Sequence, residues 1–199
     1  KQYVTEKGEP VITHDDILHG QTAWQTTGGM QLGSVWGHGA YQAPDWTADW
    51  LHRELTNWLD IVANQEYGKN FVDLNDDQQT ILKNRLTKEY RGSKVDENGT
   101  VVLSANRLAA MDKTAQYYIS LYGDDPASKV TREHFAMKDN TLPSLEARQD
   151  LAKFFFWTAW TASAERPNTH ATYTNNWPHE PLINNVPTPE NVIWSIASI

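Results

Sequence analysis

The sequence predicts a mainly α-helical domain with little β-structure. Apolar residues recur at helical spacing in several long stretches, of which the tryptophan-rich stretch 46–67 is the clearest. Residues that cap helices well precede these stretches, and several of them are followed by glycine. Only the short run 100–103, which follows a turn signal, has the composition of a strand. With 199 residues, the chain is long enough for one domain with a substantial core.

The N-terminal segment is expected to lead into the first helix. Residues 1–12 have an extended pattern with a turn at residues 7–10. Thr13 followed by Asp16 resembles a capping box, in which two side chains satisfy backbone groups at a helix start. The helix is expected to end at Gly28, because paired glycines interrupt the apolar periodicity there.

The longest predicted helix follows a glycine-rich loop at residues 29–44. Pro44 disfavours helix at the residue before it, and Asp45 is a good N-cap, so the helix should begin at residue 46. Gly68 is expected to close it. Its core face is predicted to contain seven apolar residues, which are Trp46, Trp50, Leu51, Leu55, Trp58, Leu59 and Val62.

Further helices are predicted over residues 76–90 and 104–122, with a short one over 131–137. Ser144 should cap the last long helix, which ends before residue 165 and precedes a polar tail rich in Asn and Pro. The buried faces of the first two of these helices are expected to contain Ile81, Leu82, Leu86 and Tyr90, and Leu108, Met111, Ala115, Tyr118 and Tyr122.

The composition limits the classes of function. A net charge of -8 and a pI near 5.3 argue against nucleic acid as a partner, and against an anionic lipid surface, since either needs a basic footprint. The absence of cysteine excludes disulfides, thiolate metal sites and thiol nucleophiles. The 9 tryptophans are far above ordinary usage, and large indoles favour buried or semi-polar interfaces.

The two ends of the chain differ in polarity. Residues 1–7 are polar and do not resemble a secretory leader, and no internal run approaches the roughly 20 apolar residues of a membrane span. Residues 191–199 are apolar and follow a proline-rich segment. They are either a short packed terminal helix or the start of a truncated transmembrane helix, and the position of Trp194 favours the second interpretation.

Motifs for catalysis are absent from the sequence. The 7 histidines include no His-x-x-x-His pair and no His-Glu-x-x-His motif, so a zinc site is not indicated. No phosphate loop, dinucleotide fingerprint or Gly-x-Ser-x-Gly elbow is present. The sequence therefore predicts no catalytic residue and no self-contained active site.

Three segments, taken in order, carry a resemblance to a known family. They are Trp24-Gln25 with its glycine-rich loop, Gly37-His38-Gly39-Ala40-Tyr41-Gln42-Ala43-Pro44, and Tyr173-Thr174-Asn175-Asn176-Trp177-Pro178-His179-Glu180-Pro181. Together with the apolar C-terminus they resemble the N-terminal extracytoplasmic domain of quinol-dependent nitric oxide reductase, a member of the haem–copper oxidase superfamily. The cytochrome c-like parts are residues 9–60 and 140–190, and residues 60–135 are interpreted as an insertion.

The resemblance implies a cytochrome c-like helical domain lacking haem. In the c-type relatives, a Cys-x-x-Cys-His attachment motif precedes the Gly-x-Gly-Ala-Tyr loop, and its counterparts here are Gly29, Leu32 and Gly33. The axial methionine position falls near residues 142–143, which are Leu-Pro. None of these residues can form a thioether or ligate iron. Because large cavities are destabilising, we expect the lost haem volume to be filled by Met30, Trp36 and the helix at residues 154–160.

The resemblance also implies candidate metal ligands in the loop. In the c-type relatives this loop approaches the membrane part of the enzyme, near a calcium that bridges the haem propionates. The matching residues here are Gly39, through its carbonyl, and Tyr41. Oxygen ligands suit calcium. The alternative is that Tyr41 packs at the interface between the domain and the membrane.

The implied parent protein reduces two NO to N2O with electrons from quinol, in denitrification or nitric oxide detoxification. Its two b-type haems and non-haem iron would lie in membrane helices outside this chain. The chain itself would bind no cofactor and would form a catalytically inactive structural cap on the periplasmic face of the inner membrane. Its partner would be the membrane domain of the same polypeptide. The oligomeric state is left open.

Two alternatives come from other functional classes. An extracytoplasmic carbohydrate-binding module would use its tryptophans as an exposed, coplanar platform. An independent soluble enzyme is the third interpretation, and the missing catalytic motifs disfavour it.

Overall fold

The protein is mainly α-helical, as predicted. The computed structural model describes residues 2–93 and 95–197. Its helices are α1 (His14–Thr26), α2 (Trp46–Tyr67), α3 (Asp76–Arg91), α4 (Ala105–Leu121), α5 (Lys129–His134), α6 (Leu145–Ser163) and α7 (Pro189–Ala197). Its strands are β1 (Gln2–Thr5), β2 (Pro10–Ile12) and β3 (Thr100–Leu103). Short 3-10 helices are η1 (Gly29–Leu32), η2 (Phe71–Asp73), η3 (Pro126–Ser128) and η4 (Pro181–Ile183).

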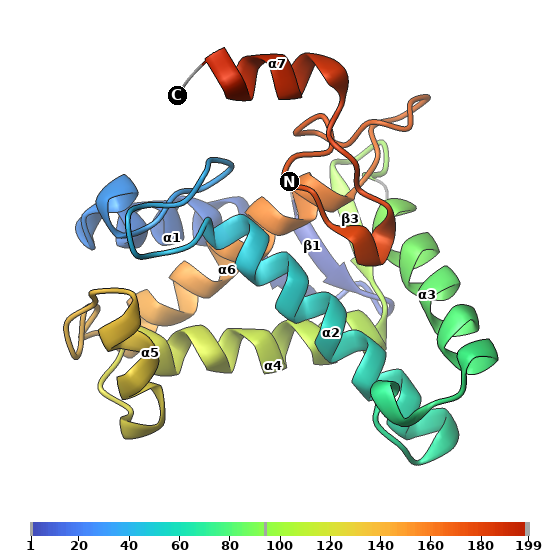
Figure 1. Cartoon of the computed structure of the whole chain (residues 1–199), viewed down its shortest axis with the longest axis horizontal. Coiled ribbons are helices and arrows are strands. Elements are labelled where there is room, and N and C mark those ends of the chain that lie inside the picture. The colour runs from blue at the N-terminus through green and yellow to red at the C-terminus, as the bar shows by residue number, and fades with distance from the viewer. Residues whose placement is uncertain (1, 94, 198–199) are drawn as a thin grey trace.

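Three long helices enclose the core of the domain. Figure 1 shows α2 crossing the centre of the molecule, with α4 below it and α6 behind it. α1 packs along α6, α5 lies at one end of α4, and α3 flanks the opposite side of the domain. The apolar faces predicted for α2 and α4 therefore pack against each other and against α6.

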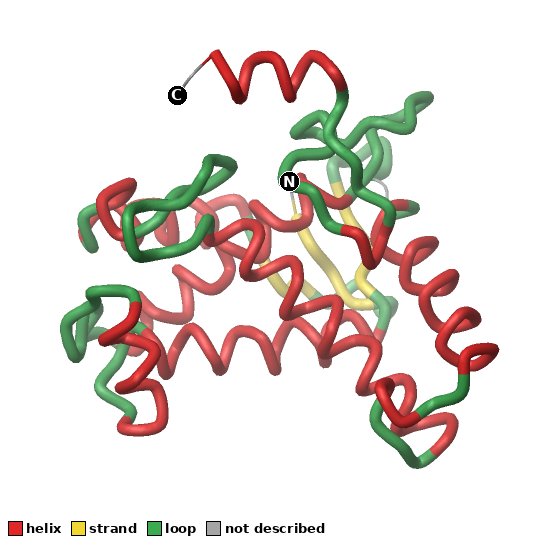
Figure 2. The backbone as a smooth tube through the Cα atoms, in the orientation of Figure 1, coloured by secondary structure: helices red, strands yellow, loops and turns green. Residues whose placement is uncertain are grey.

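The small sheet joins the N-terminus to the middle of the chain. Its strand order is β2-β1-β3, with β1 antiparallel to β2 and parallel to β3. The strands are the yellow segments of Figure 2. Tyr3 pairs with Val101, and both side chains are completely buried. The predicted strand at residues 100–103 is confirmed, and its partner is the extended N-terminal segment.

The helix starts agree closely with the capping signals in the sequence. Thr13 and Asp16 form the predicted capping box, with Asp16 Oδ2 accepting from the Thr13 N–H at 2.7 Å. Asp45 caps α2, and Gly68 ends it in the left-handed conformation at φ +65°. The predicted short helix begins earlier than expected, at Lys129. It also ends sooner, at His134, because Ala136 has a φ of +54° and cannot continue the helix.

The prediction for Ile81 on the buried face of α3 is wrong. Leu82, Leu86 and Tyr90 are completely buried at a spacing of four residues, whereas Ile81 is 50 % exposed. Ile81 lies one residue before this stripe, a rotation of about 100° around the helix axis. The exposed position arises because α3 contacts the rest of the domain along one narrow face.

α7 is a helix with no buried residue. Asn191 Nδ2 donates to Thr174 O at 2.9 Å on the body of the domain, while Ile193, Trp194 and Ile196 are exposed. The structure therefore does not show a packed terminal helix, which is one of the two interpretations of this segment. None of the described helices is long and apolar enough to cross a membrane, and residues 198–199 lie outside the described part of the chain.

Candidate functional site

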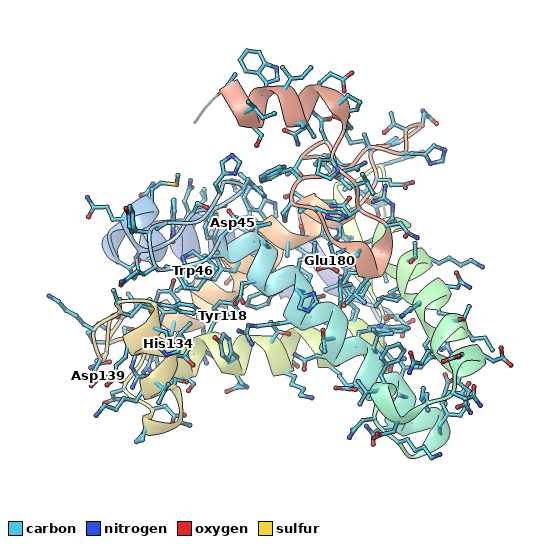
Figure 3. All side chains as sticks on the ribbon, viewed as in Figure 1. Asp45, Trp46, Tyr118, His134, Asp139 and Glu180 are labelled. Carbon is cyan, nitrogen blue, oxygen red and sulfur yellow. The ribbon has the colours of Figure 1, made fainter. Side chains whose placement is uncertain are left out.

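The loop between η1 and α2 is organised by the buried carboxylate of Asp45. Asp45 Oδ2 accepts hydrogen bonds from Ser34 Oγ at 2.7 Å and from the Gly37 N–H at 2.6 Å, while Oδ1 accepts from the Ala48 N–H at 3.0 Å. Burial raises the pKa of Asp45, although these hydrogen bonds oppose the shift. One side chain at the start of α2 thus caps the helix and fixes the path of the loop (Figure 3).

The tip of this loop carries both candidate calcium ligands. The Gly39 N–H donates to Ser34 Oγ at 2.7 Å, and the Ala40 N–H donates to Ala43 O at 2.8 Å, which closes a tight turn. Gly39 has a φ of +85°, which favours glycine. Tyr41 lies within the turn and its side chain is fully exposed. The structure thus places Gly39 and Tyr41 on one exposed tip.

The loop tip does not by itself make a metal site. Among residues 2–93 and 95–197, no three His, Asp or Glu side chains gather in an arrangement that could hold an ion. Both oxygens of Asp45, at the base of the loop, already accept hydrogen bonds. Because calcium takes about six to eight oxygen ligands, Gly39 and Tyr41 would supply only part of a site. The calcium assignment stays a prediction.

The C-terminal segment packs against the same loop. Trp177 Nε1 donates to Gly37 O at 3.1 Å, and the His38 ring contacts Trp177 edge to face with centroids 5.1 Å apart. His38 Nε2 also lies 3.1 Å from Ser195 Oγ of α7. Two of the three sequence segments that carry the family resemblance therefore meet in space.

The Trp46 indole lies beside Gly33, one of the predicted counterparts of the haem-attachment motif. Trp46 is completely buried, and its Nε1 donates to Leu32 O at 2.9 Å. A Cβ atom at position 33 would lie 2.6 Å from Trp46 Cε2 and 2.7 Å from Pro44 O. Gly33 also has a φ of +111°. The position has no room for the histidine of an attachment motif.

Aromatic side chains fill the volume around Trp46. The indole stacks on Phe155 with centroids 5.8 Å apart and an interplanar angle of 22°. It also meets Tyr118 and Tyr122 edge to face, and Figure 3 shows Trp46 next to Tyr118. Leu142, near the predicted axial-ligand position, is buried, and its N–H donates to Tyr122 O at 2.9 Å. The region is a packed core.

The residues expected to fill a lost haem volume differ in how deeply they are buried. Most of α6 is buried, as expected. The expectation for Met30 is wrong, because η1 has no buried residue and Met30 is 60 % exposed. Trp36 is partly exposed and packs against Trp157, and its Nε1 donates to Thr158 O at 3.2 Å. Trp46, by contrast, is completely buried among other aromatic rings.

The tryptophans do not form an exposed platform of the kind that a carbohydrate-binding module would use. Trp46, Trp50, Trp58 and Trp160 are buried, Trp24, Trp157 and Trp177 are half-buried, and only Trp36 and Trp194 are exposed. Exposed coplanar indoles were the feature that would have favoured carbohydrate binding, so the structure does not favour that alternative.

Sequence reasoning missed the buried ion pair between Glu54 and Arg107. Both side chains are about 1 % exposed, with Arg107 Nε 3.4 Å from Glu54 Oε1. A signal was present, because Glu54 lies one turn after Trp50 on the predicted core face of α2. A separate contact, with His52 Nδ1 3.0 Å from Glu180 Oε2, links the C-terminal segment to α2.

The mainly helical fold with its small sheet is consistent with a cytochrome c-like domain. The family model for the NorB cytochrome c-like domain of nitric oxide reductase matches residues 1–179. The chain belongs to this family and thus represents part of nitric oxide reductase, an oxidoreductase. No curated protein sequence matches the chain.

Proposed function

We propose that this chain is a haem-less domain of a quinol-dependent nitric oxide reductase and caps its catalytic membrane domain. The parent enzyme reduces two NO to N2O with electrons from quinol. Membership of the nitric oxide reductase family supports the enzyme class. The residues of the chain itself support the absence of haem and the structural role.

The contact between Gly33 and Trp46 is the main observation that supports the proposal. The chain has no cysteine for a thioether bond, and a side chain at position 33 would collide with the Trp46 ring and with Pro44 O. The residues present therefore do not fit a covalently attached c-type haem. A domain without haem passes no electrons, and a lipid-soluble quinol can deliver them directly to the membrane domain.

The exposed apolar residues near the loop support a membrane-facing surface. Tyr41 projects from the loop tip, and Ile193, Trp194 and Ile196 are exposed on α7. Ser195, on the same helix, instead points toward the domain and contacts His38. This arrangement fits a domain on the periplasmic face that meets the membrane part of its own polypeptide. A calcium at Gly39 and Tyr41 would then take its remaining ligands from that part.

The proposal is tested by measuring NO consumption with a quinol analogue and, separately, with reduced cytochrome c. The full-length parent is assayed in membranes beside the purified 199-residue chain. We expect quinol-dependent activity in the parent only, and no haem absorbance from the chain after expression with haem-maturation proteins. Cytochrome c-dependent activity without quinol activity, or a haem spectrum from the chain, would overturn the proposal.

A further inference from the structure

A group of four polar side chains lies in the core, away from the loop. Tyr3 comes from β1, Glu54 from α2, Tyr90 from α3 and Arg107 from α4. None of the four is more than 1 % exposed. We call this group the buried polar cluster. It joins four elements that are distant in the sequence.

Short contacts hold the members of the buried polar cluster together. Trp50 Nε1 donates to Glu54 Oε2 at 2.7 Å, and Arg107 Nε lies 3.4 Å from Glu54 Oε1. The Arg107 guanidinium is 4.1 Å from the centroid of the Tyr90 ring and 5.7 Å from that of Phe156. The Tyr3 ring is 5.3 Å from the same Phe156 ring, so Phe156 contacts both Arg107 and Tyr3.

The hydrogen-bonding groups of the buried polar cluster are unbalanced. Among the described residues, the hydroxyls of Tyr3 and Tyr90 and the Nε and Nη1 atoms of Arg107 have no hydrogen-bond partner of good geometry. Glu54 Oε1 is an acceptor in the same state, and it lies near both Arg107 and Tyr90 without a well-formed bond to either. In this cluster the unpaired donors therefore outnumber the unpaired carboxylate oxygen. Leaving such groups unpaired is destabilising, and nearly all buried polar groups in proteins are paired.

We propose that the buried polar cluster binds one small hydrogen-bond acceptor, a water molecule or a chloride ion, between Tyr3, Tyr90 and Arg107. An acceptor is required because the unpaired groups are mostly donors. The ligand must be small, because Trp50 and Phe156 pack against the cluster. The guanidinium charge favours an anion, while the Glu54 carboxylate opposes one. Burial raises the pKa of Glu54 despite Arg107, and a protonated Glu54 would shift the balance toward chloride.

A crevice between α4 and α6 lies next to two of the residues that pack against this site. It has a volume of about 170 Å³, and its lining includes Trp50, Met111 and Phe156. Trp50 bonds to Glu54, and Arg107 lies against Phe156. Met111 is one helical turn after Arg107 on α4. None of the four residues of the buried polar cluster lines the crevice, so the side chains of Trp50 and Phe156 separate the site from it.

Substitution of tyrosine by phenylalanine distinguishes a cluster that holds a ligand from one whose hydroxyls have no hydrogen-bond partner. If the ligand is present, Tyr3→Phe and Tyr90→Phe each remove a hydrogen bond and raise the unfolding equilibrium constant by about five-fold.

Two further tyrosines serve as matched controls. The Tyr122 hydroxyl is also buried without a hydrogen-bond partner among the described residues, but its ring contacts Trp46 and Phe155, which lie outside the buried polar cluster. We expect Tyr122→Phe to be neutral or stabilising. Tyr118→Phe is the positive control, since its hydroxyl donates to Asp49 at 2.7 Å.

The measurement is urea unfolding of the 199-residue chain in sodium chloride and in sodium gluconate at equal ionic strength. Greater stability in chloride, lost in Tyr3→Phe, would identify the ligand as chloride. The deciding variant is Tyr3→Phe, because the Tyr90 hydroxyl also lies near Glu54. Equal stability in both salts, with the five-fold effect of Tyr3→Phe, would identify the ligand as water. If Tyr3→Phe leaves stability unchanged or increases it, as expected for Tyr122→Phe, the proposal is wrong.

Discussion

Trp46 approaches Gly33 so closely that a Cβ atom on residue 33 would lie 2.6 Å from the indole Cε2 atom. The indole is anchored from two sides, because its Nε1 donates to Leu32 O and its ring stacks on Phe155. This contact explains why the sequence has glycine at position 33. It also provides the most direct test of the structure.

Gly33→Ala should destabilise the domain by about 2–4 kcal/mol, because it combines a steric clash with backbone strain at φ +111°. Gly8→Ala is the matched control. Gly8 also has a positive φ, +82°, but no atom lies within 4 Å of its added Cβ. It should cost only about 1–2 kcal/mol. Equal losses in urea unfolding would contradict the close contact at Gly33.

Asp45→Ala should lower the free energy of unfolding by about 2–4 kcal/mol, since it removes a helix cap and two buried hydrogen bonds to the loop. Ser144→Ala removes only the cap of α6 and should cost about 1 kcal/mol. Hydrogen exchange should accelerate at the Gly37 and Gly39 amides in Asp45→Ala only. Unchanged exchange at both amides would show that Asp45 does not fix the loop.

Arg107→Met should destabilise the domain by about 3–5 kcal/mol, because it leaves the Glu54 carboxylate buried without its partner. The double variant Glu54→Leu/Arg107→Met should recover most of this loss. Arg85→Met breaks the partly exposed pair with Glu66 and should cost at most about 1 kcal/mol. A double variant as unstable as Arg107→Met would argue against charge burial as the cause.

The Glu54→Gln variant should change how stability depends on pH. Burial raises the pKa of Glu54 above its ordinary value of 4.5, although Arg107, Trp50 and Tyr90 oppose the shift. The folded protein therefore binds this proton more tightly than the unfolded chain. The resulting stability is fully present below pH 4.5 and is lost as pH rises through the folded pKa. In urea unfolding from about pH 4 upward, the wild type should lose stability relative to Glu54→Gln. A difference in the free energy of unfolding between the wild type and Glu54→Gln that does not change with pH would refute this linkage.

Tyr41→Ala should leave the stability of the isolated chain unchanged, because the side chain is fully exposed. In the full-length parent, we expect lower quinol-dependent NO consumption, since the proposed function places Tyr41 against the membrane domain. Val72→Ala is the control, as Val72 is also exposed but lies in η2, away from the loop. Equal NO consumption by the wild type and both variants would show that Tyr41 does not contribute to the interface.

Local signals in the sequence were sufficient to locate most helices. The capping box at Thr13, the Asp45 cap and the Gly68 stop depend on residues within one or two turns of each other, so neighbouring sequence specifies them. The loop that carries Gly39 and Tyr41 was also identified from its glycines and Pro44. The second role of Asp45, as the centre of that loop, was missed because it depends on Ser34 and Gly37 folding back.

The amino-acid sequence was enough to establish the helical class, the positions of the helices, the absence of any thioether to haem and the family resemblance. The packed structure was needed to show that Trp46 lies against Gly33, that Met30 and Ile81 are exposed, and that the buried polar cluster gathers unpaired donors. Periodicity and capping act over a few residues, whereas these contacts depend on how distant helices pack. Because such packing fixes distances between residues far apart in the chain, no local pattern could reveal them.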